Sequence, residues 1–139
     1  MNEFINVFTD GGARGNPGLA AYGVYITDPK GEMIAGFGKK IGFSTNNIAE
    51  YRGVISALGW IVENKDKLNI KKVYFFLDSL LIYSQIMGLY KVKDANMRML
   101  LFSVREKEAS IDLPIIYKHI PREKNKKADA YVNKALDNP

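Results

Sequence analysis

The chain contains no cysteine and only one histidine, His119, among its 139 residues. The absence of cysteine excludes a disulfide framework, a cysteine-bound zinc site and a thiol nucleophile. A single histidine also excludes metal sites built from several imidazoles. Any bound metal ion must therefore be held by oxygen ligands, which favours Mg²⁺, Mn²⁺ or Ca²⁺.

Long hydrophobic runs are lacking as well, since none approaches the ~20 residues that are needed to cross a bilayer. The first residues enter a strand-like pattern with no basic segment, so we expect no signal peptide and a cytoplasmic protein without membrane contact. Hydrophobic residues make up 47% of the chain and charged residues 25%. This composition and length predict one folded domain over residues 1–139.

Basic residues outnumber acidic ones by 20 to 15, which gives a net charge of +5. Part of the excess lies in one segment that contains a single acid, Glu123, among Lys118, Arg122, Lys124, Lys126 and Lys127. A polyanionic partner such as a nucleic acid is one interpretation, and a solvated helix start is the alternative.

Two hydrophobic periods alternate along the chain. The period of two predicts strands at Phe4–Thr9, Ala20–Thr27 and Met33–Phe43, and short apolar runs predict two more at Val73–Leu77 and Pro114–His119. The helical period predicts helices from a cap at Asn47 to about Asn64, and at about Leu80–Met87, Ala95–Ala109 and Glu123–Leu136. A glycine-rich bend is expected over 11–18. This order indicates an α/β fold whose mixed sheet has an antiparallel hairpin portion and parallel strands joined by helical crossovers.

Two acidic residues follow strands that are otherwise apolar. Asp10 comes after the first strand and Asp78 after the fourth. If both strands are central and parallel, their ends lie about one strand spacing apart, roughly 5 Å. Ligands of open α/β sheets bind at such ends, although a turn or a helix cap is the alternative for each residue alone.

Two further acids lie on helix faces that we expect to be buried. Glu50 shares a stripe with Val54, and Asp129 shares one with Val132. A buried carboxylate is costly unless it is paired or bound to a metal, while a capping-box glutamate is the alternative for Glu50. Divalent cations would relieve the repulsion among the four acids, and two ions about 3.5–4 Å apart form a site for phosphodiester hydrolysis.

Four segments of the sequence resemble those of type 1 ribonuclease H and occur in that family's order. They are Thr9–Gly18 (TDGGARGNPG), Thr45–Glu50 (TNNIAE), Leu77–Ser79 (LDS) and Asn125–Asp129 (NKKAD). The resemblance covers essentially the whole chain. It implies a ribonuclease H-like five-stranded mixed sheet flanked by helices, and hydrolysis of the RNA strand of RNA–DNA hybrids with two Mg²⁺ ions, or Mn²⁺ in their place. Matched by position, the catalytic metal ligands are Asp10, Glu50, Asp78 and Asp129.

Distinguishing RNA from DNA requires contact with the 2′-hydroxyl group. Glycine backbone permits close approach to the minor groove, asparagine amides both donate and accept hydrogen bonds, and lysines neutralise phosphates. Turn chemistry and helix capping are the alternative for the glycines and asparagines. We expect the substrate contacts to come from Gly11, Gly12, Asn16, Asn46, Asn47, Lys91 and Lys93.

The sequence departs from the well-known bacterial members of that family in one loop and near the last helix. Only Gly88–Asp94 separates the two middle helices, where those members carry an extra basic helix that contains tryptophan. His119 lies ten residues before Asp129, the spacing of a catalytic histidine in many members, but it ends a stiff strand. We therefore expect Arg122, an always-charged phosphate clamp, to assist catalysis more than His119 does.

The resemblance thus implies an endonuclease that leaves 5′-phosphate and 3′-hydroxyl ends. One ion is expected on Asp10 and Asp129, and the other on Asp10, Glu50 and Asp78. The expected partner is an RNA–DNA hybrid, and the expected state is a monomer with no obligate protein partner. A DNA nuclease or resolvase of the same fold, and a non-catalytic hybrid-binding module, are the alternatives.

Overall fold

Five strands form one sheet in the order β3-β2-β1-β4-β5 in the computed structural model, which describes residues 3–138. The strands β1, β2 and β3 pair antiparallel, whereas β4 pairs parallel with β1 and with β5. Their bounds are β1 (Phe4–Arg14), β2 (Gly18–Thr27), β3 (Met33–Ser44), β4 (Lys72–Leu77) and β5 (Ile115–His119). The predicted mixed sheet and the predicted order of elements are both confirmed.

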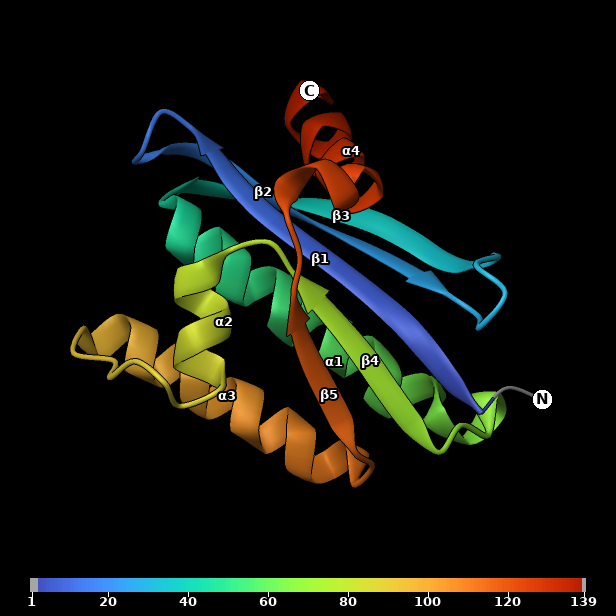
Figure 1. The fold of residues 1–139 in the computed structure, drawn as a ribbon. Coiled ribbons are helices and arrows are strands. Elements are labelled where there is room, and N and C mark those ends of the chain that lie inside the picture. The colour runs from blue at the N-terminus through green and yellow to red at the C-terminus, as the bar shows by residue number, and fades with distance from the viewer. Residues whose placement is uncertain (1–2, 139) are drawn as a thin grey trace.

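The helices cover both faces of this sheet (Figure 1). They are α1 (Asn46–Leu68), α2 (Leu80–Ile86), α3 (Ala95–Ile111) and α4 (Lys126–Asp137). Helices α1 and α3 pack together on one face, and α4 lies over β2 and β3 on the other. Because β1 and β4 are covered on the α1 side, Val7, Phe75 and Leu77 are fully buried there together with Leu58 of α1.

Close contact between α4 and the sheet depends on a glycine in β2. A Cβ atom at Gly23 would lie 2.2 Å from the carbonyl oxygen of Ala128, so any other residue would push α4 away. Gly23 is the antiparallel partner of Asp10 in the neighbouring strand. The missing side chain therefore brings the first turn of α4 over the part of β1 that bears Asp10.

Several predicted boundaries differ from those of the structure. β1 continues past Thr9 to Arg14, because Gly11, Gly12 and Ala13 keep their pairing with β2, so the predicted glycine-rich bend is confined to the turn at 15–17. The last helix begins at Lys126 rather than Glu123, since the residues after Pro121 form a 3₁₀ turn over Arg122–Lys124. The remaining bounds agree to within two residues, except that α1 extends to Leu68.

The predicted cap of α1 is also wrong. Thr45, and not Asn47, caps this helix, because the Thr45 hydroxyl accepts a hydrogen bond from the backbone N–H of Ile48 at 3.2 Å. This cap leaves the Asn47 side chain available to the cavity described below. Within residues 3–138, no helix combines the length and the apolar character that a bilayer span requires.

Candidate active site

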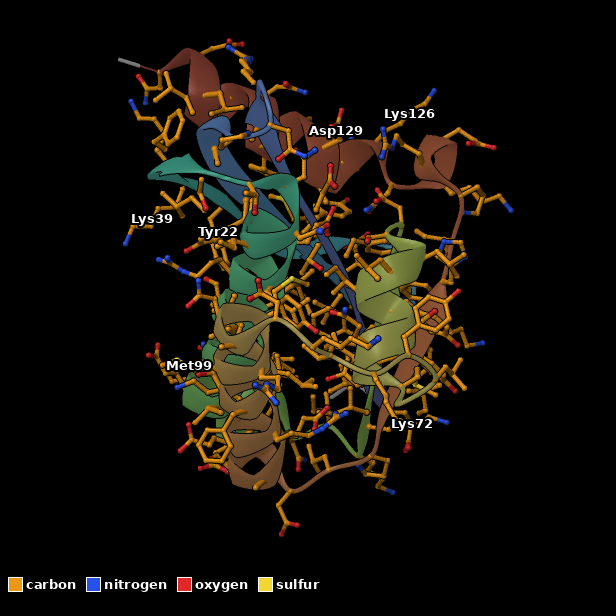
Figure 2. All side chains as sticks on the ribbon, turned by 90° about the vertical axis from the view of Figure 1, so that its left-hand side faces the viewer. Tyr22, Lys39, Lys72, Met99, Lys126 and Asp129 are labelled. Atoms are coloured by element: carbon orange, nitrogen blue, oxygen red, sulfur yellow. The ribbon has the colours of Figure 1, made fainter. Side chains whose placement is uncertain are left out.

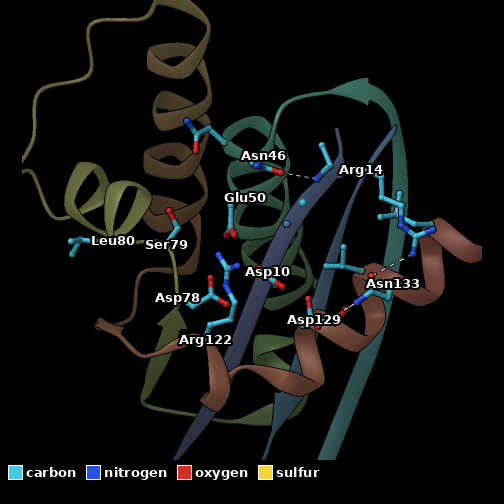
Figure 3. Close-up of a pocket in the computed structure, with 16 residues that line it drawn as sticks. Asp10, Arg14, Asn46, Glu50, Asp78, Ser79, Leu80, Arg122, Asp129 and Asn133 are labelled. Carbon is cyan, nitrogen blue, oxygen red and sulfur yellow. Dashed lines mark hydrogen bonds between the residues drawn. The ribbon is translucent and has the colours of Figure 1, made fainter. Parts of the chain in front are cut away.

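Three carboxylates meet where the C-terminal end of β4 lies beside β1, in the middle of the sheet (Figure 3). Asp10 lies on β1, Asp78 follows β4 directly, and Glu50 comes from the second turn of α1. One oxygen of each lies within 4.8 Å of the others. Since Thr9 and Leu77 are partners in the parallel register, the residues that follow them are neighbours, as the sequence predicted.

A glycine allows Glu50 to approach Asp10. A Cβ atom at Gly11 would lie only 2.4 Å from the backbone nitrogen of Glu50, so α1 contacts the backbone of β1 directly. Gly11 is thus required by helix packing, independently of any substrate contact. The capping-box interpretation of Glu50 is wrong, because with Thr45 as the cap the third helical residue is Ile48 and not Glu50.

The carboxylates repel one another in a buried setting. Asp10 and Glu50 are only 8% and 5% exposed. Burial, reinforced by the charge of Asp78, raises the pKa of Asp10 from 3.8 to about 7. Burial and then the charge of Asp10 raise the pKa of Glu50 well above its ordinary value. No salt bridge to any of the three carboxylates occurs within the described residues 3–138, so their charge is not neutralised by a protein cation.

Two buried oxygen atoms of this group lack a partner. Neither Oε2 of Glu50 nor Oδ1 of Asp78 has a hydrogen bond to any residue that the structure describes. Unpaired buried carboxylate oxygens are costly, and carboxylates are the ligands that hard divalent cations prefer. The residues present therefore fit a divalent metal ion.

Asp129 lies less deep than these three acids. Its side chain lines the same cavity beside Asp10 (Figure 3) and contributes to the raised pKa of Asp10, but it is exposed and outside the 4.8 Å cluster. The prediction that Asp129 faces inward is wrong, because Ala128 and Val132 take the buried positions of α4. Its Oδ2 instead accepts a hydrogen bond from Nδ2 of Asn133 at 3.3 Å.

A cavity of about 590 Å³ opens above the carboxylates. Four of the predicted substrate contacts line it, namely Gly11, Gly12, Asn46 and Asn47, and so do all four acids and Arg122. Oδ1 of Asn46 accepts a hydrogen bond from the backbone N–H of Ala13 at 2.7 Å. The amide group of Asn46 is thereby fixed between β1 and the start of α1, with its Nδ2 donor left for a ligand.

Four of the predicted site residues lie outside the cavity. Asn16 is exposed, and its Oδ1 accepts a hydrogen bond from the backbone N–H of Asn46 at 2.9 Å. Lys91 and Lys93 are exposed between α2 and α3. His119 is exposed at the end of β5, where its Nε2 lies 3.2 Å from the carbonyl oxygen of Asp78.

Three residues of this region were given no role by the sequence reasoning. Arg14 and Asn133 line the cavity, and the buried side chain of Asn125 lies behind it. Asn125 and Asn133 stand four residues before and after Asp129. A helix brings residues at that spacing to one face, so the spacing was the signal that could have identified Asn133.

The strand order and the carboxylate cluster together define the ribonuclease H-like class of α/β domains. A family model described as reverse transcriptase-like matches residues 8–135. The crystal structure of RNase H1 from Halobacterium salinarum superposes with a TM-score of 0.89, is 33% identical, and is matched over 98% of this chain and 99% of that one. The chain belongs to this reverse transcriptase-like family and is a compact type 1 ribonuclease H domain.

Two further relatives show how the match extends. LC11-RNase H1 was isolated from compost. Its structure in complex with an RNA/DNA hybrid has a TM-score of 0.90 at 42% identity over 96% of both chains. The bifunctional protein Rv2228c of Mycobacterium tuberculosis is 37% identical over 96% of this chain. The chain spans 35% of Rv2228c and 64% of the ribonuclease HI of Halobacterium salinarum, to which it is 35% identical.

Proposed function

We propose that this chain is an endoribonuclease that hydrolyses the RNA strand of RNA–DNA hybrids and leaves 5′-phosphate and 3′-hydroxyl ends. The observation that supports it best is the buried, unneutralised group of Asp10, Glu50 and Asp78 at the base of an open cavity. Two relatives are named ribonuclease H, and one of them was solved with a hybrid.

The four acids divide into a deep and a shallow set. Asp10, Glu50 and Asp78 would hold one Mg²⁺ ion, and Asp10 together with the exposed Asp129 a second, with Mn²⁺ as a substitute. When bound, the ions supply water activation and stabilisation of charge at the scissile phosphate. All four ligands come from one chain, so the proposed reaction needs no second subunit.

Other residues of the cavity would position the hybrid. Asn46, whose amide is fixed, and the neighbouring Asn47 both line the cavity. They would face the minor groove of a bound hybrid, where the 2′-hydroxyl distinguishes RNA from DNA. A Cβ at Gly12 would meet no atom closer than 3.9 Å, so this backbone is open to a close approach. Outside the cavity, Lys126 begins α4 and lies near Asp129, where it can neutralise a phosphate, whereas Lys72 begins β4 and lies far from Asp129 (Figure 2).

Cleavage of matched duplexes tests the proposal. A labelled hybrid, the same sequence as double-stranded DNA and the same sequence as double-stranded RNA are each incubated with Mg²⁺ or with EDTA. We expect cleavage of the RNA strand of the hybrid, only with Mg²⁺. Cleavage of DNA would instead support a DNA nuclease of the same fold, and binding without cleavage would support a hybrid-binding module.

Arg122 and His119 differ in their expected contribution to turnover. Arg122 lines the cavity and His119 does not, so Arg122→Ala should lower kcat by roughly tenfold to a hundredfold. His119→Ala should change kcat less than threefold. Steady-state cleavage of a labelled hybrid measures both values. Arg122→Lys, which keeps the charge but loses the fork of donors, should be intermediate. A loss of two orders of magnitude in a folded His119→Ala protein would reverse the assignment.

The exposed loop lysines should affect binding rather than turnover. Lys91→Ala and Lys93→Ala should each weaken hybrid binding and reduce the slope of log K against log salt by about 0.9 for each lost phosphate contact. Binding to a labelled hybrid at several salt concentrations measures both quantities. Lys30→Ala, in the turn between β2 and β3, is the matched control and should change neither. An unchanged slope in the Lys91 and Lys93 variants would show that the loop does not touch the backbone of the hybrid.

A further inference from the structure

The side chain of Asn125 joins the segments that bear the carboxylates. It is 1% exposed, and its Nδ2 donates hydrogen bonds to the backbone carbonyl of Thr9 and to Oδ2 of Asp78, both at 2.9 Å. The backbone carbonyl of Asn125 accepts from the N–H of Asp129 at 3.1 Å. One residue therefore contacts the strand residue before Asp10, the carboxylate of Asp78 and the backbone of Asp129.

The orientation of this side chain is not that of a helix cap. Asn125 occupies the cap position of α4, where an asparagine ordinarily accepts a hydrogen bond from the helix. Here its side chain makes no capping hydrogen bond, and its Oδ1 is buried without a partner within residues 3–138. The missing cap is unfavourable for α4 and the unpaired Oδ1 is unfavourable for the folded chain, and both accompany the turn of Nδ2 toward Thr9 and Asp78.

This contact distinguishes the two oxygens of Asp78. Oδ2 of Asp78 is held by Asn125, whereas the buried Oδ1 has no hydrogen bond to a described residue. A carboxylate that is held through one oxygen can rotate little about its side-chain bonds. Residues that hold the ligands of a metal in this way raise metal affinity and fix the geometry of the site.

We propose that Asn125 is a positioning residue: it holds Asp78 through Oδ2 so that Oδ1 is presented to a divalent cation, and it ties β1, the end of β4 and α4 around that site. The inference rests on the proposed function for the identity of the cation. Asn125 makes no contact with the substrate in this proposal. The effect of Asn125 is on metal affinity and, through Asp78, on turnover.

The decisive measurement is metal binding by the free protein. We expect Asn125→Ala to raise the Kd for Mn²⁺, measured by titration without nucleic acid, by about tenfold, because second-layer contacts of this kind change affinity by 10- to 100-fold. Asn64→Ala is the matched control. Asn64 also donates through Nδ2 to a carbonyl, that of Trp60 at 2.8 Å, but lies in α1 outside the residues that line the cavity, and its Kd should not change.

The kinetic pattern separates positioning from simple loss of stability. In Asn125→Ala, high Mg²⁺ should restore part of kcat, while KM for the hybrid stays near that of the unaltered protein. A variant that is merely less stable would bind Mn²⁺ normally at temperatures where it is folded, and that result would overturn the proposal. If the unaltered protein binds Mn²⁺ but cleaves no hybrid, the proposed function fails while the comparison of Kd values still decides the role of Asn125.

A second measurement needs no variant. In the unaltered protein, the side-chain NH₂ resonances of Asn125 should shift during a Mg²⁺ titration followed by NMR, with the same midpoint as the backbone amide of Asp78. The side-chain resonances of Asn64 should not move. Resonances of Asn125 that stay unchanged at saturating Mg²⁺ would overturn the proposal even where Asn125→Ala does not fold.

Discussion

Asp10→Asn is expected to reduce cleavage of the RNA–DNA hybrid by about a thousandfold or more, with the fold intact. Asp10 is the only acid that we assign to both metal ions. It is also 8% exposed and within 4.8 Å of Glu50 and Asp78, so its charge is held close to both. The amide keeps the shape of the side chain but removes the negative charge that attracts a cation.

Initial rates on a labelled hybrid at saturating Mg²⁺, compared with circular dichroism of the same preparation, measure this effect. Asp66→Asn, an exposed aspartate of α1, is the matched control and should retain full activity. Hybrid binding by Asp10→Asn should be unchanged or tighter, because one charge that repels phosphate is gone. Near-normal turnover in this variant would contradict the two-ion proposal, and loss of folding would mean that Asp10 is structural.

In metal-free buffer, the free energy of unfolding should fall as the pH rises from about 4 to 8. The pKa of Asp10 is about 7 in the folded chain and near 3.8 when it is unfolded, so the folded state binds this proton more tightly. The corresponding stability is fully present below pH 3.8 and is lost as the pH approaches 7. A rise from 3.8 to about 7 corresponds to roughly 4 kcal/mol.

Urea unfolding in EDTA at pH 5 and pH 8 measures this dependence. Adding Mg²⁺ at pH 8 should restore most of the lost stability, because a cation that binds only the folded state offsets the repulsion. In Asp10→Asn the decline should be smaller but should persist, because burial still raises the pKa of Glu50, while Asp66→Asn should behave as the unaltered protein does. Stability that is independent of pH in EDTA would show that burial and the neighbouring charges do not raise the pKa values of Asp10 and Glu50 in the folded chain.

The elements of the fold could be predicted from local patterns because their periods are distinct. The apolar run Val73–Leu77 and the helical stripe that begins near Tyr51 each bury a face, and both elements occur where expected. Boundaries were harder to predict wherever a residue suits two structures. The sequence predicts a bend at Gly11 and Gly12, because glycine is typical of turns. Both residues lie in β1 instead, because their partners in β2 satisfy their backbone hydrogen bonds.

For the site, the sequence alone was enough to single out Asp10, Glu50, Asp78 and Asp129 and to indicate that Asp10 and Asp78 are neighbours. Carboxylates that follow apolar strands or interrupt buried helix stripes conflict with their surroundings, and that conflict is visible without coordinates. For Asp129 the expected burial was wrong, although the residue does line the cavity. Only the tertiary structure decided how deep each acid lies. Glu50 is buried because Gly11 admits the backbone of α1, and Asp129 is exposed because α4 begins at Lys126 and turns Ala128 and Val132 inward.

The role of Asn125 was likewise beyond the sequence, because its hydrogen bonds join Thr9 and Asp78 across 116 and 47 residues of chain. Contacts between such distant residues depend on how closely the packed elements approach one another, which local hydrophobic patterns do not specify.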